Sequence, residues 1–81
     1  MIEDYCLIIY EGEPFRKGEH IALGNKRTII GRSTPNFTPD IAFTSPYVSR
    51  RHACIYFENG HYYLCDLGST HGTLLNEKPL P

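Results

Sequence analysis

The sequence predicts an all-β fold, an antiparallel β-sandwich that forms one domain over residues 1–81. Apolar, β-branched and aromatic residues occur in short runs, and turn-forming residues separate these runs at close intervals. No apolar pattern with helical spacing lasts longer than one turn. Short strands joined by tight turns are typical of two packed sheets, so a helical or α/β domain is not expected.

The first half of the chain contains four expected strands. They cover residues 5–10, 18–23, 27–32 and 40–43. In the second strand, Ile21 and Leu23 are expected to share one face because side chains alternate along a strand. The third strand ends at Gly31-Arg32, and residues 33–39 form a loop because they include two prolines and small polar residues.

The second half is organised around Asn59-Gly60, the sequence that most strongly indicates a two-residue hairpin turn. The hairpin strands are expected over residues 52–58 and 61–67, and a further strand over 73–76 is followed by a turn at Glu77-Lys78. The expected register pairs Glu58 with His61, Phe57 with Tyr62, Ile55 with Leu64, and Ala53 with Asp66.

This register assigns the hairpin side chains to two faces. One face is expected to be core: Ala53, Ile55, Phe57, Tyr62 and Leu64. The other face is expected to be partly exposed: Cys54, Tyr56, Tyr63 and Cys65. The two cysteines lie directly opposite each other and are expected to be free thiols, because a disulfide across a strand pair is strained.

The hairpin also brings two polar clusters to the same end of one sheet. The residues expected to lie near one another are Ser49, Arg50, His52, Ser69, Thr70 and His71. With Arg32 at a neighbouring strand end, they provide guanidinium and hydroxyl donors, which are the groups that bind a phosphate dianion. The sequence therefore predicts an anion-binding site at this end.

Charge and cysteine content exclude other classes of protein. A formal charge of −1 argues against general nucleic-acid binding, which needs a basic excess. No apolar run approaches the ~20 residues of a membrane span, and no secretory signal is recognisable. Three cysteines without a repeated spacing do not form a disulfide framework, so we expect a reducing, cytoplasmic location. No cofactor is indicated.

Four blocks in the second part of the chain resemble the forkhead-associated (FHA) domain. They are Gly31-Arg32, Ser49-Arg50-Arg51-His52-Ala53, residues 66–73 (DLGSTHGT) and Asn76, within a motif region over 27–76. The resemblance implies a β-sandwich of the SMAD/FHA type whose loops at one end bind a phosphothreonine peptide. The expected function is phosphorylation-dependent protein binding in Ser/Thr kinase signalling. The expected partner is a phosphothreonine protein, either a Ser/Thr kinase or its substrate.

The resemblance also implies roles for individual residues. The ligand-contacting set is Arg32 and Ser49 at the phosphate, Arg50 as a second positive contact, Thr70 and His71 at the threonine site, and Tyr47 near the third residue after the phosphothreonine. Residues implied to support the loops are Gly31, His52, Gly72 and Asn76. Arg51 alternates with Arg50 and is expected to be a solvated charge.

Three features depart from the family pattern. His71 stands where the family usually has an asparagine that holds the ligand backbone. Glu77 stands where glycine is favoured, so a turn other than type I′ is expected there. The sequence ends at Pro81, where family members usually continue through two or three more strands. We therefore expect either further strands in a larger protein, of which this chain is the N-terminal part, or a dimer formed through exposed strand edges.

Three alternative functions are also compatible with the sequence. Ser49, His52 and Asp66 are the ingredients of a hydrolase triad, although no nucleophile elbow surrounds the serine. Cys54, Cys65 and His61 share one face, but the short cysteine spacing of structural zinc sites is absent, and no metal is expected. The domain could also bind partners or oligomerise without regard to phosphorylation. The favoured reading is a binding module and not an enzyme.

Overall fold

The computed structural model describes residues 5–81, which form eight β-strands and no helix. The strands are β1 (Tyr5–Ile8), β2 (His20–Leu23), β3 (Thr28–Arg32), β4 (Ile41–Phe43), β5 (Ala53–Glu58), β6 (His61–Asp66), β7 (Leu74–Leu75) and β8 (Lys78–Pro79). The all-β prediction is therefore confirmed. The domain was predicted from Met1, and its first four residues lie outside the described part.

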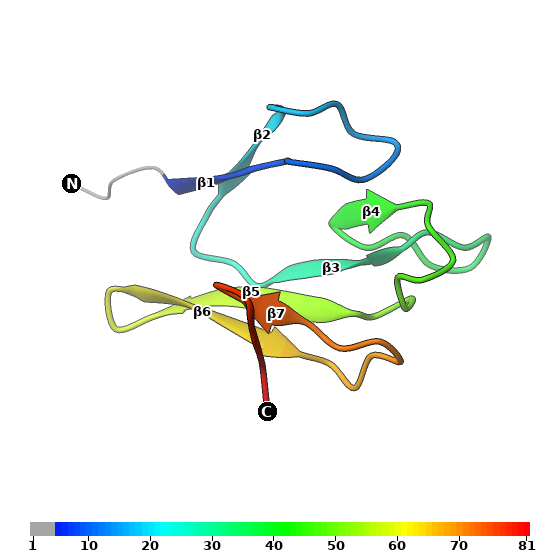
Figure 1. Ribbon diagram of the computed structural model, residues 1–81. Helices are drawn as coiled ribbons and strands as arrows, with labels where there is room; N and C mark the ends of the chain where they lie inside the picture. The colour runs from blue at the N-terminus through cyan, green and yellow to red at the C-terminus, as the bar shows by residue number, and fades with distance from the viewer. Residues whose placement is uncertain (1–4) are drawn as a thin grey trace.

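The largest sheet has four strands in the order β4-β3-β5-β6, and β1-β2 and β7-β8 form two separate antiparallel pairs. Figure 1 shows β1 and β2 on one side of the large sheet and β7 on another side of it. One pair departs from the predicted antiparallel pattern, because β3 and β4 run parallel. The loop at residues 33–40 returns the chain across the sheet before β4 begins, and parallel pairing requires such a crossover.

The hairpin of β5 and β6 has the predicted register throughout. Glu58 pairs with His61, and the pairing continues without a bulge to Ala53 and Asp66. Asn59 and Gly60 both have positive φ angles, 51° and 82°, as a type I′ turn requires. The predicted register is therefore confirmed. It could be predicted because the Asn-Gly turn and the alternation of apolar residues specify the same register.

The C-terminal hairpin differs from the prediction in the position of its turn. Leu75 pairs with Lys78, so the turn lies at Asn76-Glu77 and residues 78–79 form a strand. Asn76 and Glu77 have φ angles of 52° and 69°. The expectation of another turn type was wrong: both central residues have the positive φ that a type I′ turn requires, although a glutamate is strained there.

The core lies between the large sheet and the β1-β2 pair. The buried apolar side chains are Ile9, Ile41, Ala53 and Ile55, together with Cys54, which lies on the opposite face of β5 from Ala53 and Ile55. Tyr62 contacts this layer: its ring packs edge-to-face on Tyr5 at 5.1 Å, and its hydroxyl donates to the carbonyl oxygens of Leu23 and Gly24. Ile21 and Leu23 are both half-buried, as their shared face predicts.

The observed burial of the hairpin side chains differs in part from the prediction for the two faces. Cys54 was expected to be half-exposed, but only 3% of its surface is accessible. It lies on the interior strand β5, and its Sγ is 3.4 Å from that of Cys65 on the neighbouring strand β6. Phe57, Tyr62 and Leu64 are half-buried and not fully enclosed. Within residues 5–81, no helix is long and apolar enough to cross a membrane.

Candidate functional site

The loops that carry the polar clusters lie at one end of the large sheet. Figure 1 shows that the loops after β3, before β5 and after β6 gather at the right-hand end, while the Asn59-Gly60 turn lies at the opposite end. We refer to residues 44–52 as the β4–β5 loop and to residues 67–73 as the β6–β7 loop. The hairpin register produces this arrangement because it pairs the last residue of β6 with the first of β5.

Ser49 joins the two loops. Its Oγ accepts the backbone N–H of Thr70 at 3.1 Å. Its own backbone N–H donates to Nδ1 of His52 at 3.0 Å. Because Oγ already accepts one hydrogen bond from the protein, its hydroxyl hydrogen can be directed outward to an anionic oxygen.

His52 braces the same loops from below. Its Nδ1 accepts the Ser49 amide, and its Nε2 donates to the carbonyl oxygen of Gly72 at 2.8 Å. This pair of bonds assigns the neutral tautomer that carries its hydrogen on Nε2. Both ring nitrogens are thus occupied by backbone groups, which leaves no free nitrogen to act as a base toward a serine hydroxyl.

Arg32 extends from the end of β3 beneath the β4–β5 loop. Its Nε donates to the carbonyl oxygen of Val48 at 2.9 Å, and its backbone N–H donates to the carbonyl oxygen of Ser49 at 3.0 Å. Within residues 5–81 its guanidinium forms no ion pair with a carboxylate. The two terminal nitrogens are therefore available for a bidentate interaction with an oxyanion.

Gly31 allows the loop to lie directly against β3. A Cβ atom on Gly31 would lie 1.9 Å from the carbonyl oxygen of Arg50 and 3.1 Å from that of Ser49. Both neighbours are backbone atoms and cannot rotate away. The absence of a side chain at this position therefore determines how deeply Ser49 and Arg50 are seated.

A surface hollow of about 480 Å³ lies beside Ser49 and is lined by Phe37, Ser49, Arg50 and Arg51. The guanidinium of Arg51 stacks over the Phe37 ring, with 4.3 Å between the guanidinium carbon and the ring centroid. Arg51 is exposed, as a solvated charge should be, but it also makes this stacking contact, which the sequence did not indicate. Sequence reasoning also missed Phe37, because nothing in its loop indicates where that loop folds back.

Tyr47 and His71 form a pair at the edge of the site. Their rings meet edge-to-face with 5.6 Å between centroids, and both side chains are exposed. Tyr47 has 71% of its surface accessible. The pair connects the β4–β5 and β6–β7 loops beside Thr70 and presents aromatic surface to a ligand.

Asp66 organises the β6–β7 loop. Its carboxylate accepts hydrogen bonds from the backbone N–H groups of Gly68 and Ser69 and from the hydroxyls of Ser69 and Thr73. The hydrogen bonds from Ser69 and then from Thr73 lower the pKa of Asp66 from 3.8 to about 2. The sequence signal was present, because an aspartate with Gly-Ser two and three residues further on is typical of a side chain that caps its own turn.

The hydrolase alternative is inconsistent with these contacts. Asp66 bonds to its own loop rather than to His52, and His52 receives the backbone amide of Ser49 rather than its hydroxyl. The relay that a Ser-His-Asp triad needs is therefore not assembled. For the metal alternative, residues 5–81 hold no group of three or more His, Cys, Asp and Glu side chains arranged around a metal position.

Gly72 and Asn76, both predicted to support the loops, have different positions in the structure. Gly72 belongs to the site, because its carbonyl oxygen accepts the His52 ring and its φ of 83° suits glycine. Asn76 lies instead in the β7-β8 turn, and no hydrogen bond joins it to the two loops within residues 5–81. In that turn its φ of 52° is one that asparagine tolerates.

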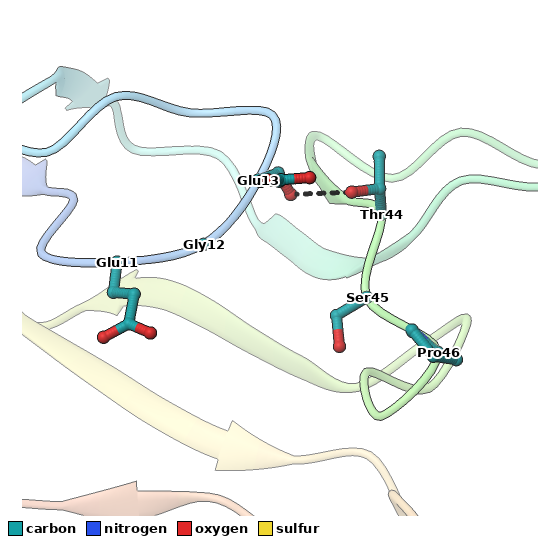
Figure 2. A pocket seen from close by; sticks show the side chains of 6 residues that line it. All are labelled: Glu11, Gly12, Glu13, Thr44, Ser45 and Pro46. Atoms are coloured by element: carbon teal, nitrogen blue, oxygen red, sulfur yellow. Dashed lines mark hydrogen bonds between the residues drawn. The ribbon is translucent and has the colours of Figure 1, made fainter.

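A second hollow, of about 640 Å³, has the opposite electrostatic character (Figure 2). It lies between the β1–β2 loop and the start of the β4–β5 loop, and its lining includes Glu11, Glu13 and Ser45. The carbonyl oxygen of Glu13 accepts the amide and the hydroxyl of Thr44. Because two glutamates and no cation line it, a phosphate is favoured in the hollow beside Ser49 over this one.

Loops that carry cations and hydroxyl groups at one end of a β-sandwich are typical of modules that bind anionic peptide groups. The comparison with known families is consistent with this class, since the FHA domain matches residues 28–81. This chain belongs to the FHA domain family. FHA domains are phosphopeptide-binding modules and are not themselves enzymes.

Similar proteins include the probable E3 ubiquitin-protein ligase dma1 of Schizosaccharomyces pombe, with 47% identity over 51 residues, or 58% of this chain and 19% of dma1. The FHA domain-containing protein FhaB of Mycolicibacterium smegmatis is 37% identical over 70 residues, 86% of this chain and 42% of FhaB. The chain thus spans less than half the length of either relative.

Proposed function

We propose that this chain binds phosphothreonine in partner proteins through the β4–β5 and β6–β7 loops. The proposal rests on one observation: Arg32, Ser49 and Arg50 lie together at one end of the sheet. Within residues 5–81, no carboxylate forms an ion pair with either arginine. Three groups with free N–H or O–H donors suit a dianion, and charge-assisted hydrogen bonds contribute about 1.5–3 kcal/mol each.

Each residue has a distinct part in the proposed complex. Arg32 provides the bidentate guanidinium, Ser49 provides a hydroxyl hydrogen, and Arg50 adds charge from the wall of the hollow. Thr70 and His71 flank the threonine methyl, which favours phosphothreonine over phosphoserine by about 0.8 kcal/mol for one buried methyl group. Arg51, held over Phe37, contributes further positive potential to the hollow.

The proposed setting is Ser/Thr kinase signalling in a reducing, cytoplasmic compartment. The family assignment and the similarity to FhaB support a role in phosphopeptide signalling, while the compartment is inferred from the three free cysteines. The chain acts in this proposal as a binding module without catalytic activity of its own. The partner is a phosphothreonine protein, either a kinase or its substrate.

Calorimetric titration with matched peptides tests the proposal. A phosphothreonine peptide is expected to bind, and the same peptide with plain threonine is not. Arg32→Ala is expected to cost about 2–5 kcal/mol, a loss of roughly 30- to several-thousand-fold in affinity. Ser49→Ala is expected to cost about 1–3 kcal/mol.

Arg16→Ala provides the matched control, because Arg16 lies in the exposed β1–β2 loop on another part of the molecule. Its affinity is expected to equal that of the unchanged protein. Equal binding of phosphorylated and plain peptides, or full binding by Arg32→Ala with an intact circular dichroism spectrum, would show that this cluster is not the binding site.

A second candidate function is association that does not depend on phosphorylation. Exposed apolar side chains on the C-terminal hairpin, Leu74 and Leu75, favour it. Treatment of a bound partner with phosphatase separates the two functions. Release of the partner supports phosphothreonine binding, and retention supports association through apolar surface.

A further inference from the structure

Two cysteines form a close pair on the hairpin that carries the binding loops. Cys54 on β5 and Cys65 on β6 are directly opposite each other, and their Sγ atoms are 3.4 Å apart. Both are free thiols. Cys6, the third cysteine, is exposed on β1. The pair takes no part in the proposed phosphate contacts.

The strand pairing places these sulfurs within reach of a covalent bond. Counting from the two-residue turn, Glu58 and His61 form a hydrogen-bonded pair, and the alternation makes Cys54 and Cys65 another. Such pairs have Cα atoms about 5.5 Å apart, which is inside the disulfide range of roughly 4.4–6.8 Å. The sulfurs must approach by roughly 1.4 Å to reach the bond length of about 2.05 Å. The bridge can therefore close without separation of the strands, although with strain.

The two thiols differ in accessibility. Cys54 is buried, while Cys65 is half-exposed. Burial, followed by the hydrogen bond with Cys65, raises the pKa of the Cys54 thiol above its usual 9.0. Cys54 therefore keeps its proton, and Cys65, the more accessible of the two, is the sulfur that an oxidant reaches first.

We propose that Cys54 and Cys65 form a reversible redox site, which hydroperoxides oxidise to a cross-strand disulfide and small thiols reduce again. In the first step the Cys65 sulfur attacks the peroxide, the O–O bond breaks and Cys65 becomes a sulfenic acid, while the departing hydroxide takes the proton that the Cys65 thiol loses and leaves as one water. In the second step the Cys54 sulfur attacks that of Cys65, and the departing hydroxide takes the Cys54 proton as a second water. Two thiols are oxidised and one peroxide is reduced.

Reversibility follows from the strain in the bridge. Strained disulfides have higher reduction potentials than relaxed structural ones, so they are reduced more readily by cellular thiols. The oxidised and reduced forms can therefore exchange under mild conditions. A relaxed structural disulfide would instead resist glutathione.

The position of the pair connects oxidation to the binding loops. Only Ala53 separates Cys54 from His52, and Asp66 follows Cys65 directly. His52 and Asp66 hold the loops through hydrogen bonds of 2.5–3.0 Å. A shift of the strands on bond formation is expected to weaken phosphopeptide binding about tenfold, the loss of roughly one hydrogen bond. This consequence rests on the proposed function.

Oxidation of the Cys6→Ser variant tests the redox site without interference from the exposed thiol. Hydrogen peroxide is added to the folded protein, and the remaining thiols are alkylated and counted by mass spectrometry. The expected result is a loss of both thiols together, a Cys54–Cys65 linked peptide after digestion, and recovery of both thiols in millimolar glutathione. Two alkylated thiols after peroxide treatment, or a bridge that survives glutathione, would overturn the proposal.

Titration with the phosphothreonine peptide then tests the effect on binding. The reduced variant is expected to bind about ten times more tightly than its oxidised form. Peroxide is expected to leave the affinity of a Cys6→Ser/Cys65→Ser variant unchanged, since that variant cannot form the bridge. Equal affinity of both redox forms would overturn the connection to the loops. Failure of the reduced protein to bind would count against the proposed function, while the thiol count would still decide the redox site.

Discussion

Asp66 shows how one side chain can organise a binding loop without touching a ligand. Its carboxylate satisfies two backbone amides and two hydroxyls of the β6–β7 loop. Ser69 in turn uses its Oγ to accept the backbone N–H of Gly72, whose carbonyl oxygen binds His52. A chain of hydrogen bonds therefore runs from the end of β6 to the histidine that supports Ser49.

We predict that Asp66 makes the stability of the domain depend on pH in the acid range. The folded pKa, about 2, lies below the ordinary 3.8. The stability contributed by the carboxylate is therefore fully present above pH 3.8 and is lost as the pH falls toward 2. Asp66→Asn should be less stable than the unchanged protein at pH 7, and the difference should shrink over this interval.

Urea denaturation at several pH values between 2 and 7 measures this difference. Thr73→Val serves as the control, because it removes one donor to the carboxylate and should raise the pKa of Asp66 toward its ordinary value. A stability difference between Asp66→Asn and the unchanged protein that stays constant down to pH 2 would contradict the prediction.

Tyr47 gives a prediction about ligand sequence. By the family resemblance it lies near the third residue after the phosphothreonine, and it presents an exposed aromatic ring beside His71. An aromatic ring offers apolar surface and no positive charge, so isoleucine or leucine should be preferred at that ligand position. A phosphopeptide library with that position randomised tests this preference. Selection of aspartate would refute it, and Tyr47→Arg is expected to shift the preference toward aspartate.

At the scale of elements, the site depends on how closely a loop approaches a strand. The β4–β5 loop rests on β3, and the backbone carbonyls of Ser49 and Arg50 occupy the space where a side chain at position 31 would stand. The strand therefore positions the loop through the absence of a Cβ atom. Hydrogen bonds from Arg32 to Val48 and Ser49 then hold the loop in place.

We predict that Gly31→Ala destabilises the domain and abolishes phosphopeptide binding together. Its Cβ would meet the Arg50 carbonyl oxygen at 1.9 Å, so the loop must move. Overpacking of this kind costs about 1–3 kcal/mol, and displacement of Ser49 and Arg50 separates the phosphate donors. Thermal denaturation and peptide titration measure the two effects.

Gly24→Ala is the matched control, because a Cβ at Gly24 meets nothing within 4 Å. This variant is expected to bind peptide and to unfold like the unchanged protein. If Gly31→Ala retained full affinity, the close approach of loop and strand would not determine the position of the phosphate donors.

At the scale of the whole molecule, the packing between sheets is uneven. The β7-β8 pair makes no ladder with the large sheet, and Leu74 and Leu75 are 64% and 47% exposed. Ile8 on β1 and Tyr10 beyond it are also exposed. Unpaired strand edges together with exposed apolar residues favour pairing with further strands.

We predict that the 81-residue polypeptide self-associates through these surfaces. Sedimentation velocity over a range of concentrations should show a dimer in exchange with a monomer. Leu74→Lys is expected to shift the equilibrium toward the monomer, because it places a charge on the exposed hairpin. An exposed replacement elsewhere, Thr38→Lys, should have no effect. A monomer at every concentration tested would contradict the prediction.

The sequence by itself determined most of the β-strands, the register of the β5-β6 hairpin and which loops meet at one end of the sheet. These features depend on local chemistry: the turn at Asn59-Gly60 and the alternation of apolar residues act over a few residues and agree with each other. The register alone was enough to predict that Ser49 and Thr70 would lie close together, and a hydrogen bond now joins them.

Only the tertiary structure decided how those residues contact one another. The burial of Cys54, the parallel pairing of β3 with β4 and the stacking of Arg51 on Phe37 all depend on segments that are distant in sequence. Long loops such as residues 33–40 can close in many ways, since the entropic cost of closure varies slowly with length. Contacts between distant segments stabilise one of these arrangements. Local sequence patterns cannot predict which one, because they do not include those contacts.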